Sequence, residues 1–428
     1  MTAVEKSTYK GALAAAMDSG AYIKFVEIHT EMKSEMEAHK QCMFIYWHRL
    51  FLVVFENMLR GQGPEYACVT IPYFNWIETS NKALSGECKT LGDCSPIMKE
   101  LGGLTGNTQQ TVVINGKNIT GTCVSNAPLD HFCSWGSAKV PASISYASVI
   151  GQLFNGTNIE KVSRTVERGC HADIHAALGS TMAKFQCPAD PIFWSHHAML
   201  DALLTIFHKC RVGTRRMTFE EKAADPVAWA SCKRRVRKNP TGPPFKPTDA
   251  VAMRTGENGS NPIEASEDPV IGRYLKGVPN RFADLMDGSD LGTNSYTDEI
   301  NGLLAVMYNT CGGTEPHSVP VVIAFNLTRS EKRMMNWYNE TMSLNGGQSI
   351  ADMKRQICMF HDQCLGGIVD YTDDFKALWG VKEPRCKTIV NAISNGEQKI
   401  VDSAWKSKME AHFGCPHPVN KTVTREFE

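Results

Sequence analysis

The stretch DPIFWSHHAMLDALLTIFHKC, residues 190–210, constrains the fold of this chain more than any other segment. It is apolar on nearly every side at helical spacing, which is typical of a helix buried in the middle of a bundle. Asp190 is expected to be the N-cap and Pro191 the first helical residue. His196 and His197 lie side by side within this helix. A lone histidine on an apolar face is usually a satisfied core residue, so the meaning of the pair depends on the other histidines.

The first half of the chain is expected to be mainly helical. Residues 1–60 read as helices, and the apolar segment FIYWHRLFLVVFENMLRG stops at Gly61, a suitable C-cap. Residues 62–160 are rich in Gly, Asn, Ser and Cys, which predicts loops and short elements tied by disulfides. IEKVSRTVERGCHADIHAALGS predicts another helix, which ends at Gly179. The whole chain is therefore expected to be mainly α, with disulfide-tied loops and a mixed, largely helical C-terminal region.

The composition changes after Cys210. Residues 232–247, CKRRVRKNPTGPPFKP, are a basic run followed by a Pro/Gly linker. The basic run is either a solvated face or a dibasic processing site. Residues 272–310 look helical, and residues 330–428 combine helical patterns with four cysteines. The expected division is a domain over 1–230, a linker with a polar loop over 231–270, and a C-terminal region over 271–428.

Composition also restricts partners and compartment. The formal net charge is zero and no apolar run reaches the length of a membrane span, so neither nucleic acid nor a membrane is expected as a partner. Fifteen cysteines are many for a cytosolic enzyme. Secretion is expected, with the missing signal peptide indicating a fragment or a trimmed form. The oligomeric state is left open. Six N-x-S/T sequons are candidate glycosylation sites, at Asn118, Asn155, Asn258, Asn326, Asn339 and Asn420.

Two groups of three histidines lie on or beside the apolar helices. His171 and His175 are four residues apart, so both imidazoles project from one helix face and can grip one metal ion. A zinc protease would need a Glu after the first of them, but Ala172 stands there. His39 and His48 are nine residues apart, about 900° of helix rotation. They can share an ion only if His39 lies in a turn before the helix that carries His48.

Histidine groups without a cysteine, methionine or carboxylate at matching spacing suit copper, zinc or iron. Two such groups in one chain indicate two ions. Two coppers held by neutral imidazoles can cycle between Cu(I) and Cu(II) and bind dioxygen, whereas a protonated histidine cannot ligate.

The segments HKQCMFIYWHRLFLVVFENML and DPIFWSHHAMLD resemble the two copper signatures of the tyrosinase family of type-3 copper proteins. That family includes tyrosinases, catechol oxidases and molluscan haemocyanin units, and the resemblance covers roughly residues 8–215. It implies a four-helix bundle around two copper ions. The implied copper A ligands are His29, His39 and His48, and the implied copper B ligands are His171, His175 and His197.

The resemblance also implies roles for residues around the ligands. His196 is the non-ligand of its pair, and Phe193 matches an aromatic that stacks beside copper B. Arg49 and Asp201 match a pair of opposite charges expected to orient the ligand helices. Some members tie the second copper A histidine to a cysteine two residues before it, but Glu37 occupies that position.

Glu167 matches a glutamate that, in several members able to hydroxylate monophenols, positions a water together with an Asn. Ala172 replaces that Asn, and Ala176 is also small and uncharged. This departure weakens the case for monophenol hydroxylation and leaves o-diphenol oxidation unaffected. The alternative for Glu167 is a solvated helix carboxylate.

The expected activity is oxidation of a small phenol or catechol to an o-quinone with dioxygen, for pigment formation or crosslinking. A haemocyanin-like dioxygen carrier is the alternative. It is disfavoured because a carrier would have a β-rich C-terminal domain and a Cys-x-His near copper A. A metal-free relative is disfavoured because all six ligands are present. Residues after about 315 are expected either to cover the active site until cleaved or to complete the core with disulfide-tied helices.

Overall fold

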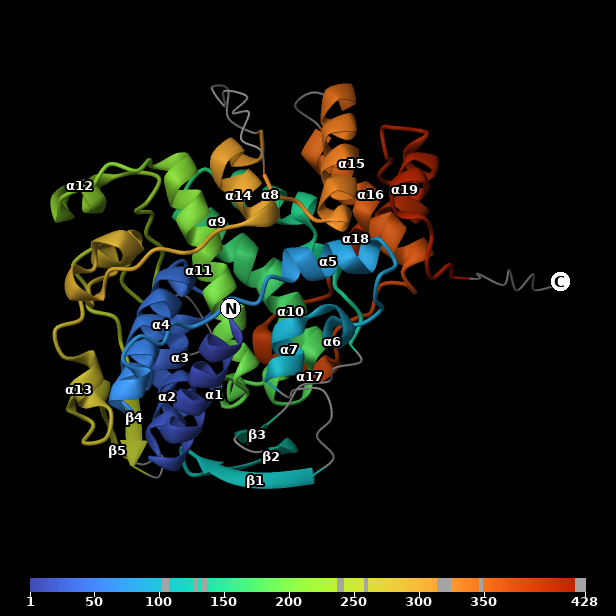
Figure 1. Ribbon diagram of the computed structural model, residues 1–428. Coiled ribbons are helices and arrows are strands. Elements are labelled where there is room, and N and C mark those ends of the chain that lie inside the picture. The colour runs from blue at the N-terminus through green and yellow to red at the C-terminus, as the bar shows by residue number, and fades with distance from the viewer. Residues whose placement is uncertain are drawn as a thin grey trace.

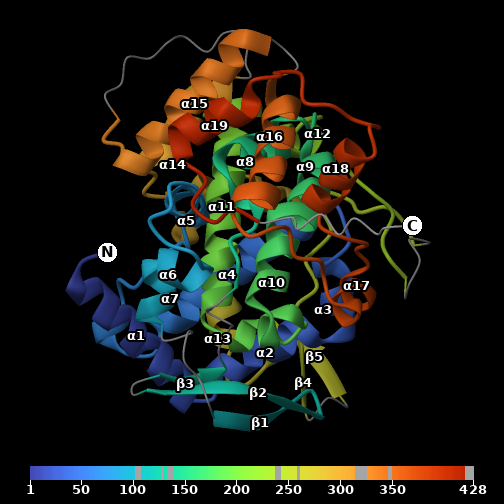
Figure 2. The same ribbon diagram turned by 90° about the vertical axis from the view of Figure 1, so that its right-hand side faces the viewer.

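The computed structural model describes residues 1–101, 108–126, 129–132, 138–236, 242–257, 261–313, 325–345 and 349–419. The fold is mainly α, as the sequence predicts, and Figures 1 and 2 show helices throughout with small strands at one end. The helices of the first half are α1 (Ala3–Asp18), α2 (Ala21–Thr30), α3 (Met32–Ala38), α4 (Phe44–Arg60), α5 (Trp76–Leu84), α6 (Leu91–Cys94), α7 (Pro96–Glu100), α8 (Tyr146–Phe154), α9 (Ile159–Val166), the π-helix η3 (Glu167–His171), α10 (Ala172–Leu178), α11 (Ile192–Arg211) and α12 (Phe219–Ala224).

The C-terminal half is helical where it is regular. Its helices are α13 (Gly272–Leu275), α14 (Gly302–Thr310), α15 (Arg329–Asn345), α16 (Ser349–Cys364), α17 (Asp373–Trp379), α18 (Arg385–Ser394) and α19 (Trp405–Phe413). Strands β1 (Thr108–Ile114), β2 (Lys117–Asn126) and β3 (Leu129–Phe132) form an antiparallel sheet, and β4 (Arg254–Glu257) pairs with β5 (Asn261–Glu264).

The two apolar helices α4 and α11 pack against each other in the centre of the molecule (Figures 1 and 2). Helix α4 ends at Gly61, as predicted. Helix α11 begins one residue later than predicted, at Ile192, whose N–H donates to the Asp190 carboxylate at 3.1 Å. Both helices are buried over most of their length, so any polar side chain on them lies in a dry environment.

The C-terminal helices belong to the same hydrophobic core as the first half. Trp337 on α15, Phe360 on α16 and Phe413 on α19 are buried in one continuous cluster with α4 and α11. Helix α17 lies apart from α15, α16 and α19 and packs beside α10 (Figure 2). The five disulfides found among the described cysteines are Cys42–Cys232, Cys88–Cys94, Cys210–Cys311, Cys358–Cys386 and Cys364–Cys415.

The prediction of helix over residues 272–310 is wrong for most of that segment. Only α13 and α14 are α-helical, and short 3-10 turns join them. Gly277 and Gly292 adopt left-handed backbone angles there, and Pro279 interrupts the segment between them. Residues 62–160 are more regular than expected, since they contain α5–α8 and the sheet β1–β3. Among the described residues, no helix is both long enough and apolar enough to cross a bilayer.

Candidate metal centre

His29, His39 and His48 come together although they lie on different elements. His29 is on α2 and His48 on α4, while His39 follows α3 with an extended backbone, φ −124° and ψ 151°. Lys40 then takes a left-handed conformation, φ 59°, and turns the chain toward α4. One ring nitrogen of each histidine lies within 4.8 Å of those of the other two. The turn that the nine-residue spacing requires is therefore present.

His171, His175 and His197 form the second group. His171 ends the π-helix η3, His175 lies on α10, and His197 lies on α11. Their ring nitrogens also lie within 4.8 Å of one another. Gly169 allows the distorted turn before His171, because a Cβ there would lie 2.0 Å from the Gln152 side-chain oxygen. The imidazoles of His48 and His197 stack with centroids 4.3 Å apart, so the two groups face each other.

Backbone carbonyls fix the orientation of four of the six rings. A neutral imidazole that donates through Nδ1 leaves the Nε2 lone pair for a metal, and such partners are usual for metal-binding histidines. The Nδ1–carbonyl pairs are His29–Phe185 at 2.7 Å, His48–Phe44 at 2.8 Å, His171–Glu167 at 3.0 Å and His175–Met182 at 2.7 Å.

The six imidazoles are neutral at ordinary pH because they are buried. Burial lowers the pKa of His29 to about 3 and that of His175 to about 4. The pKa values of His39, His48, His171 and His197 lie well below the usual range, again mainly through burial and then through the neighbouring imidazoles, beside which a second positive charge would be repelled. Each ring is therefore in the protonation state that ligates a metal.

The site fits two metal ions on the evidence of its unsatisfied nitrogens. The Nε2 atoms of His39, His171, His175 and His197 are buried and have no hydrogen-bond partner among the described residues. Buried polar atoms without partners are costly, so such nitrogens within groups of neighbouring imidazoles indicate that each group can bind a metal ion. Imidazole-only donor sets suit copper, zinc or iron.

His196 lies within 4.8 Å of the second group but differs from it chemically. The Trp76 indole N–H donates to His196 Nδ1 at 3.2 Å. The proton of neutral His196 is therefore on Nε2, which leaves no lone pair for a metal. Trp76 lies 120 residues before His196, so nothing in the local sequence points to this contact.

Comparison with known proteins agrees with this geometry. A family model for the common central domain of tyrosinase matches residues 19–209, which include all six histidines. Tyrosinases from Streptomyces antibioticus and Streptomyces glaucescens are 27% identical over 223 and 225 residues, covering 47% of this chain and 78% of each relative. Tyrosinase P of Aspergillus terreus is 24% identical over 242 residues, covering 46% of this chain and 66% of that protein.

This chain contains a tyrosinase domain, over residues 19–209. It is thus an oxidoreductase of the type-3 copper class. The matched residues end before Cys210, so the tyrosinase domain does not include the C-terminal helices.

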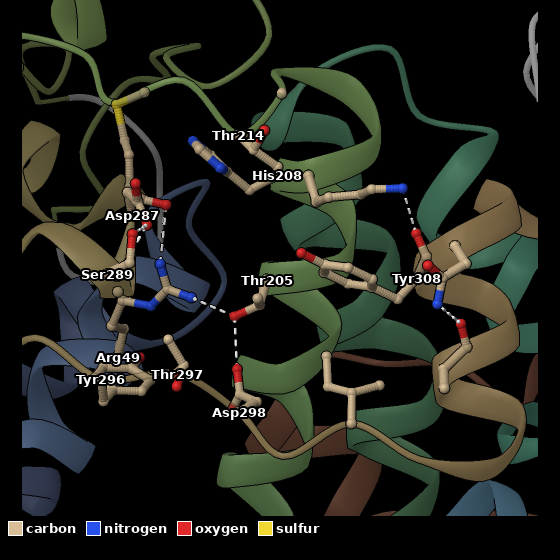
Figure 3. A pocket seen from close by; sticks show the side chains of 17 residues that line it. Arg49, Thr205, His208, Thr214, Asp287, Ser289, Tyr296, Thr297, Asp298 and Tyr308 are labelled. Atoms are coloured by element: carbon tan, nitrogen blue, oxygen red, sulfur yellow. Dashed lines mark hydrogen bonds between the residues drawn. The ribbon is translucent and has the colours of Figure 1, made fainter.

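Phe193 lies against the histidine groups, and the Arg49–Asp201 pair lies between α4 and α11. The Phe193 ring lies 4.1 Å from the His197 ring and 5.1 Å from the His29 ring, between centroids. Arg49 Nε donates to Asp201 at 2.7 Å, and the two side chains join α4 to α11. Arg49 also lies on the wall of a cavity of about 480 Å3, whose lining side chains are drawn in Figure 3.

Glu167 is buried rather than solvated. Its side chain is 5% exposed, and the backbone N–H of Lys40 donates to one carboxylate oxygen. The other oxygen has no hydrogen-bond partner among the described residues. Burial raises the pKa of Glu167 to about 7, while the Lys40 N–H and nearby arginines oppose that rise. A pKa of about 7 places the titration of this buried carboxyl group near neutral pH.

Helix α17 covers the histidines of this tyrosinase domain. The Trp379 ring lies 5.1 Å from His175, 5.3 Å from His39 and 5.6 Å from His171, between centroids. Its indole N–H donates to the Ala183 carbonyl at 2.9 Å. Ala172 and Ala176 pack against α17, so both alanines lie among apolar contacts.

Proposed function

We propose that this chain oxidises catechols to o-quinones with dioxygen, using two copper ions. The observation that carries the proposal is the pair of facing histidine groups within the tyrosinase domain. His29, His39 and His48 would hold one ion, and His171, His175 and His197 the other, within a four-helix bundle. When bound, the copper ions would supply the redox chemistry, accepting electrons from the phenol and passing them to dioxygen. The quinones would serve pigment formation or crosslinking.

The protein orients the imidazole rings and keeps water away from them. The four backbone carbonyls hold the imidazole planes, which leaves the Nε2 atom of each of these rings as the nitrogen that would bind copper. Phe193, Phe185 and Trp379 surround the histidines and exclude water. An apolar, water-poor site strengthens electrostatic interactions with a bound phenol.

We propose that o-diphenols are preferred over monophenols. Hydroxylation of a monophenol would need a base and a held water to deprotonate the phenol, whereas oxidation of a catechol would not depend on them. Glu167 could act as that base, since its pKa of about 7 suits proton transfer. Ala172, however, offers no hydrogen bond to hold the water. The absence of the Asn therefore supports diphenol oxidation as the main activity.

Oxygen uptake tests the proposal and the preference together. Copper-loaded protein is offered 4-methylcatechol and then 4-methylphenol, with His175→Ala as the matched control. We expect copper-dependent uptake with the catechol, little with the monophenol, and none with His175→Ala. Comparable rates on both substrates would overturn the preference. Reversible oxygen binding without turnover, even with the site uncovered, would instead indicate a carrier.

We further propose that α17 covers the site and limits substrate entry. Hydrogen bonds hold this helix and the residues just before it. The Trp379 N–H donates to the Ala183 carbonyl, Lys40 Nζ donates to the Leu378 carbonyl at 2.7 Å, and the Tyr371 hydroxyl donates to Asp173. The remaining C-terminal helices are part of the core. We therefore propose that α17 covers the site while the other C-terminal helices complete the core.

Uncovering the site tests the role of α17. We expect Trp379→Ala to raise kcat/KM for 4-methylcatechol several-fold, because the ring over three ligand histidines is removed. Trp405→Ala, on α19 and outside this cover, is the matched control and should not raise it. Equal kcat/KM in the wild type and Trp379→Ala would show that α17 does not restrict access.

We propose secretion from two features of the structure. Asn118, Asn155, Asn326 and Asn339 are exposed, as a glycosylation acceptor must be. Asn258 and Asn420 lie outside the described residues. The five disulfides suit an oxidising compartment.

A further inference from the structure

A second cavity, of about 300 Å3, lies where the tyrosinase domain meets the C-terminal helices. Four of its lining side chains are cationic and come from four elements. They are Arg164 on α9, Arg168 on η3, Lys354 on α16 and Arg385 on α18. None of the described residues that line this cavity is acidic. The cavity is therefore a concentration of positive charge on a chain whose net charge is zero.

These cations are poorly neutralised by the protein. Arg164 Nε pairs with Glu160 at 3.2 Å. Arg168, Lys354 and Arg385 form no ion pair or hydrogen bond through their side chains with any residue in the described part of the chain. The nearby carboxylates act only at longer range: Glu167 attracts Arg164 and Arg168, and Asp173 attracts Lys354.

Lys354 carries the clearest sign of this imbalance. Burial, followed by the like charge of Arg385, lowers the pKa of Lys354 to about 8 despite the attraction of Asp173. A cation held beside another cation is destabilised by Coulomb repulsion. An anion in the cavity would relieve that repulsion.

Neutral donors border the same cavity. Helix α18 begins at Arg385, and no side chain caps it because Pro384 precedes it. The Lys387 N–H donates to the Pro384 carbonyl at 2.9 Å, so only the N–H groups of Arg385 and Cys386 lack an acceptor within the helix, and the helix dipole favours an anion there. The Ser143 hydroxyl, 7% exposed, also lines the cavity. It lies close enough to influence the pKa of Asp173, but it has no hydrogen bond of acceptable geometry among the described residues.

We propose that this cavity binds a phosphate or sulfate group between Arg168, Lys354 and Arg385. Arginine and lysine donate charge-assisted hydrogen bonds to such oxyanions, and arginine can do so with two parallel N–H groups. The bound anion links the segment that carries His171 to helices α16 and α18. Its occupancy therefore stabilises the contact between the tyrosinase domain and the C-terminal helices, independently of copper.

Calorimetric titration of the full chain with sodium phosphate, at constant ionic strength, tests the proposal. A sulfated disaccharide is titrated in a second arm, which separates a free ion from an ester carried on a sugar. We expect saturable binding of one equivalent in at least one arm. The double variant Lys354→Gln/Arg385→Gln should bind roughly tenfold more weakly or worse, because it loses two charge-assisted contacts. Lys354→Arg keeps the charge and should bind like the wild type.

Lys406→Gln/Arg329→Gln is the matched control, since both residues are exposed cations elsewhere in the C-terminal region. It removes the same charge and should leave the affinity unchanged. Arg385→Gln alone, at an exposed position, serves if the double variant does not fold. Absence of saturable binding in both arms, or equal affinity in the cavity variants and the wild type, would overturn the proposal.

Discussion

The Arg49–Asp201 pair shows how one buried contact can hold two ligand helices. Arg49 is 1% exposed and Asp201 is 6% exposed. Arg49 also donates to the Leu285 and Met286 carbonyls, and the Tyr296 hydroxyl donates to Asp201. The charges are thus fully hydrogen-bonded, which is the condition under which a buried pair is tolerated.

Asp201→Ala should lower the free energy of unfolding by about 3–5 kcal/mol, because it leaves the Arg49 charge buried without its partner. Asp284→Ala is the matched control, since Asp284 pairs with the half-exposed Arg281 at 2.8 Å. That surface pair should contribute less than about 1 kcal/mol. Urea unfolding of the two variants checks the difference, and equal losses would contradict the account.

Asp298 predicts a dependence of stability on pH. Burial and the negative charge of Asp201 raise the pKa of Asp298 to about 6 from an ordinary value of 3.8. The folded state therefore holds this proton more tightly than the unfolded chain. The resulting stabilisation is present below pH 4 and is lost as the pH rises through 6.

Asp298→Asn removes the titration and keeps an oxygen to accept from Thr205, which donates to Asp298 at 2.8 Å (Figure 3). The two-unit shift corresponds to about 3 kcal/mol, and partial exposure reduces it to roughly 1–2 kcal/mol. The free energy of unfolding of the variant, relative to that of the wild type, should therefore rise by about that amount between pH 4 and pH 8. Urea unfolding at both pH values measures the gain, and a pH-independent difference would show that Asp298 does not titrate as described.

At the scale of elements, the Cys42–Cys232 disulfide holds the turn that places His39. Cys42 lies between His39 and α4, and its partner is 190 residues away. Cys42 is wholly buried, so this segment is anchored inside the protein. The bridge joins the turn after His39 to the segment after α12.

Replacing both cysteines by serine should lower the free energy of unfolding by about 2–5 kcal/mol, because a very long loop is freed in the unfolded chain. Cys88–Cys94, which spans 6 residues, is the matched control and should contribute less. Thermal unfolding of both double variants measures the contrast. A larger loss for the short bridge would contradict this explanation.

The elements that sequence predicts best are those with strong apolar periodicity. Helices α4 and α11 and the end at Gly61 follow from pattern and capping alone. The irregular structure of residues 276–301 was harder to predict, because glycines and short turns break a helix that composition favours. The position of His39 followed from spacing, since nine residues cannot place two ligands on one helix face.

Contacts between distant segments could not be predicted. Trp76 meets His196, and Trp379 lies over His39, His171 and His175, yet neither tryptophan has a local motif. The cavity lined by Arg164, Arg168, Lys354 and Arg385 likewise draws these four cationic residues from four helices. Such sites depend on tertiary packing. The histidine groups, Phe193 and the Arg49–Asp201 pair were recoverable from the sequence because they lie on or beside strongly patterned helices.

At the scale of the whole molecule, a tyrosinase domain and a C-terminal set of helices share one core. Helices α15, α16 and α19 extend that core, and α17 reaches back over the histidines. The disulfide Cys210–Cys311 joins the end of α11 to the end of α14. The division into domains at residues 230 and 270 remains a prediction, because the shared core does not by itself place a boundary.

The central claim is that two copper ions, held by six histidines, act together on a catechol. Catechol-dependent oxygen uptake is measured while copper is added stepwise to metal-free protein, using Trp379→Ala so that the cover does not limit entry. We expect oxygen uptake to rise until two coppers are bound per chain and then to stay constant. Saturation at one copper per chain, or no uptake at any loading, would contradict it.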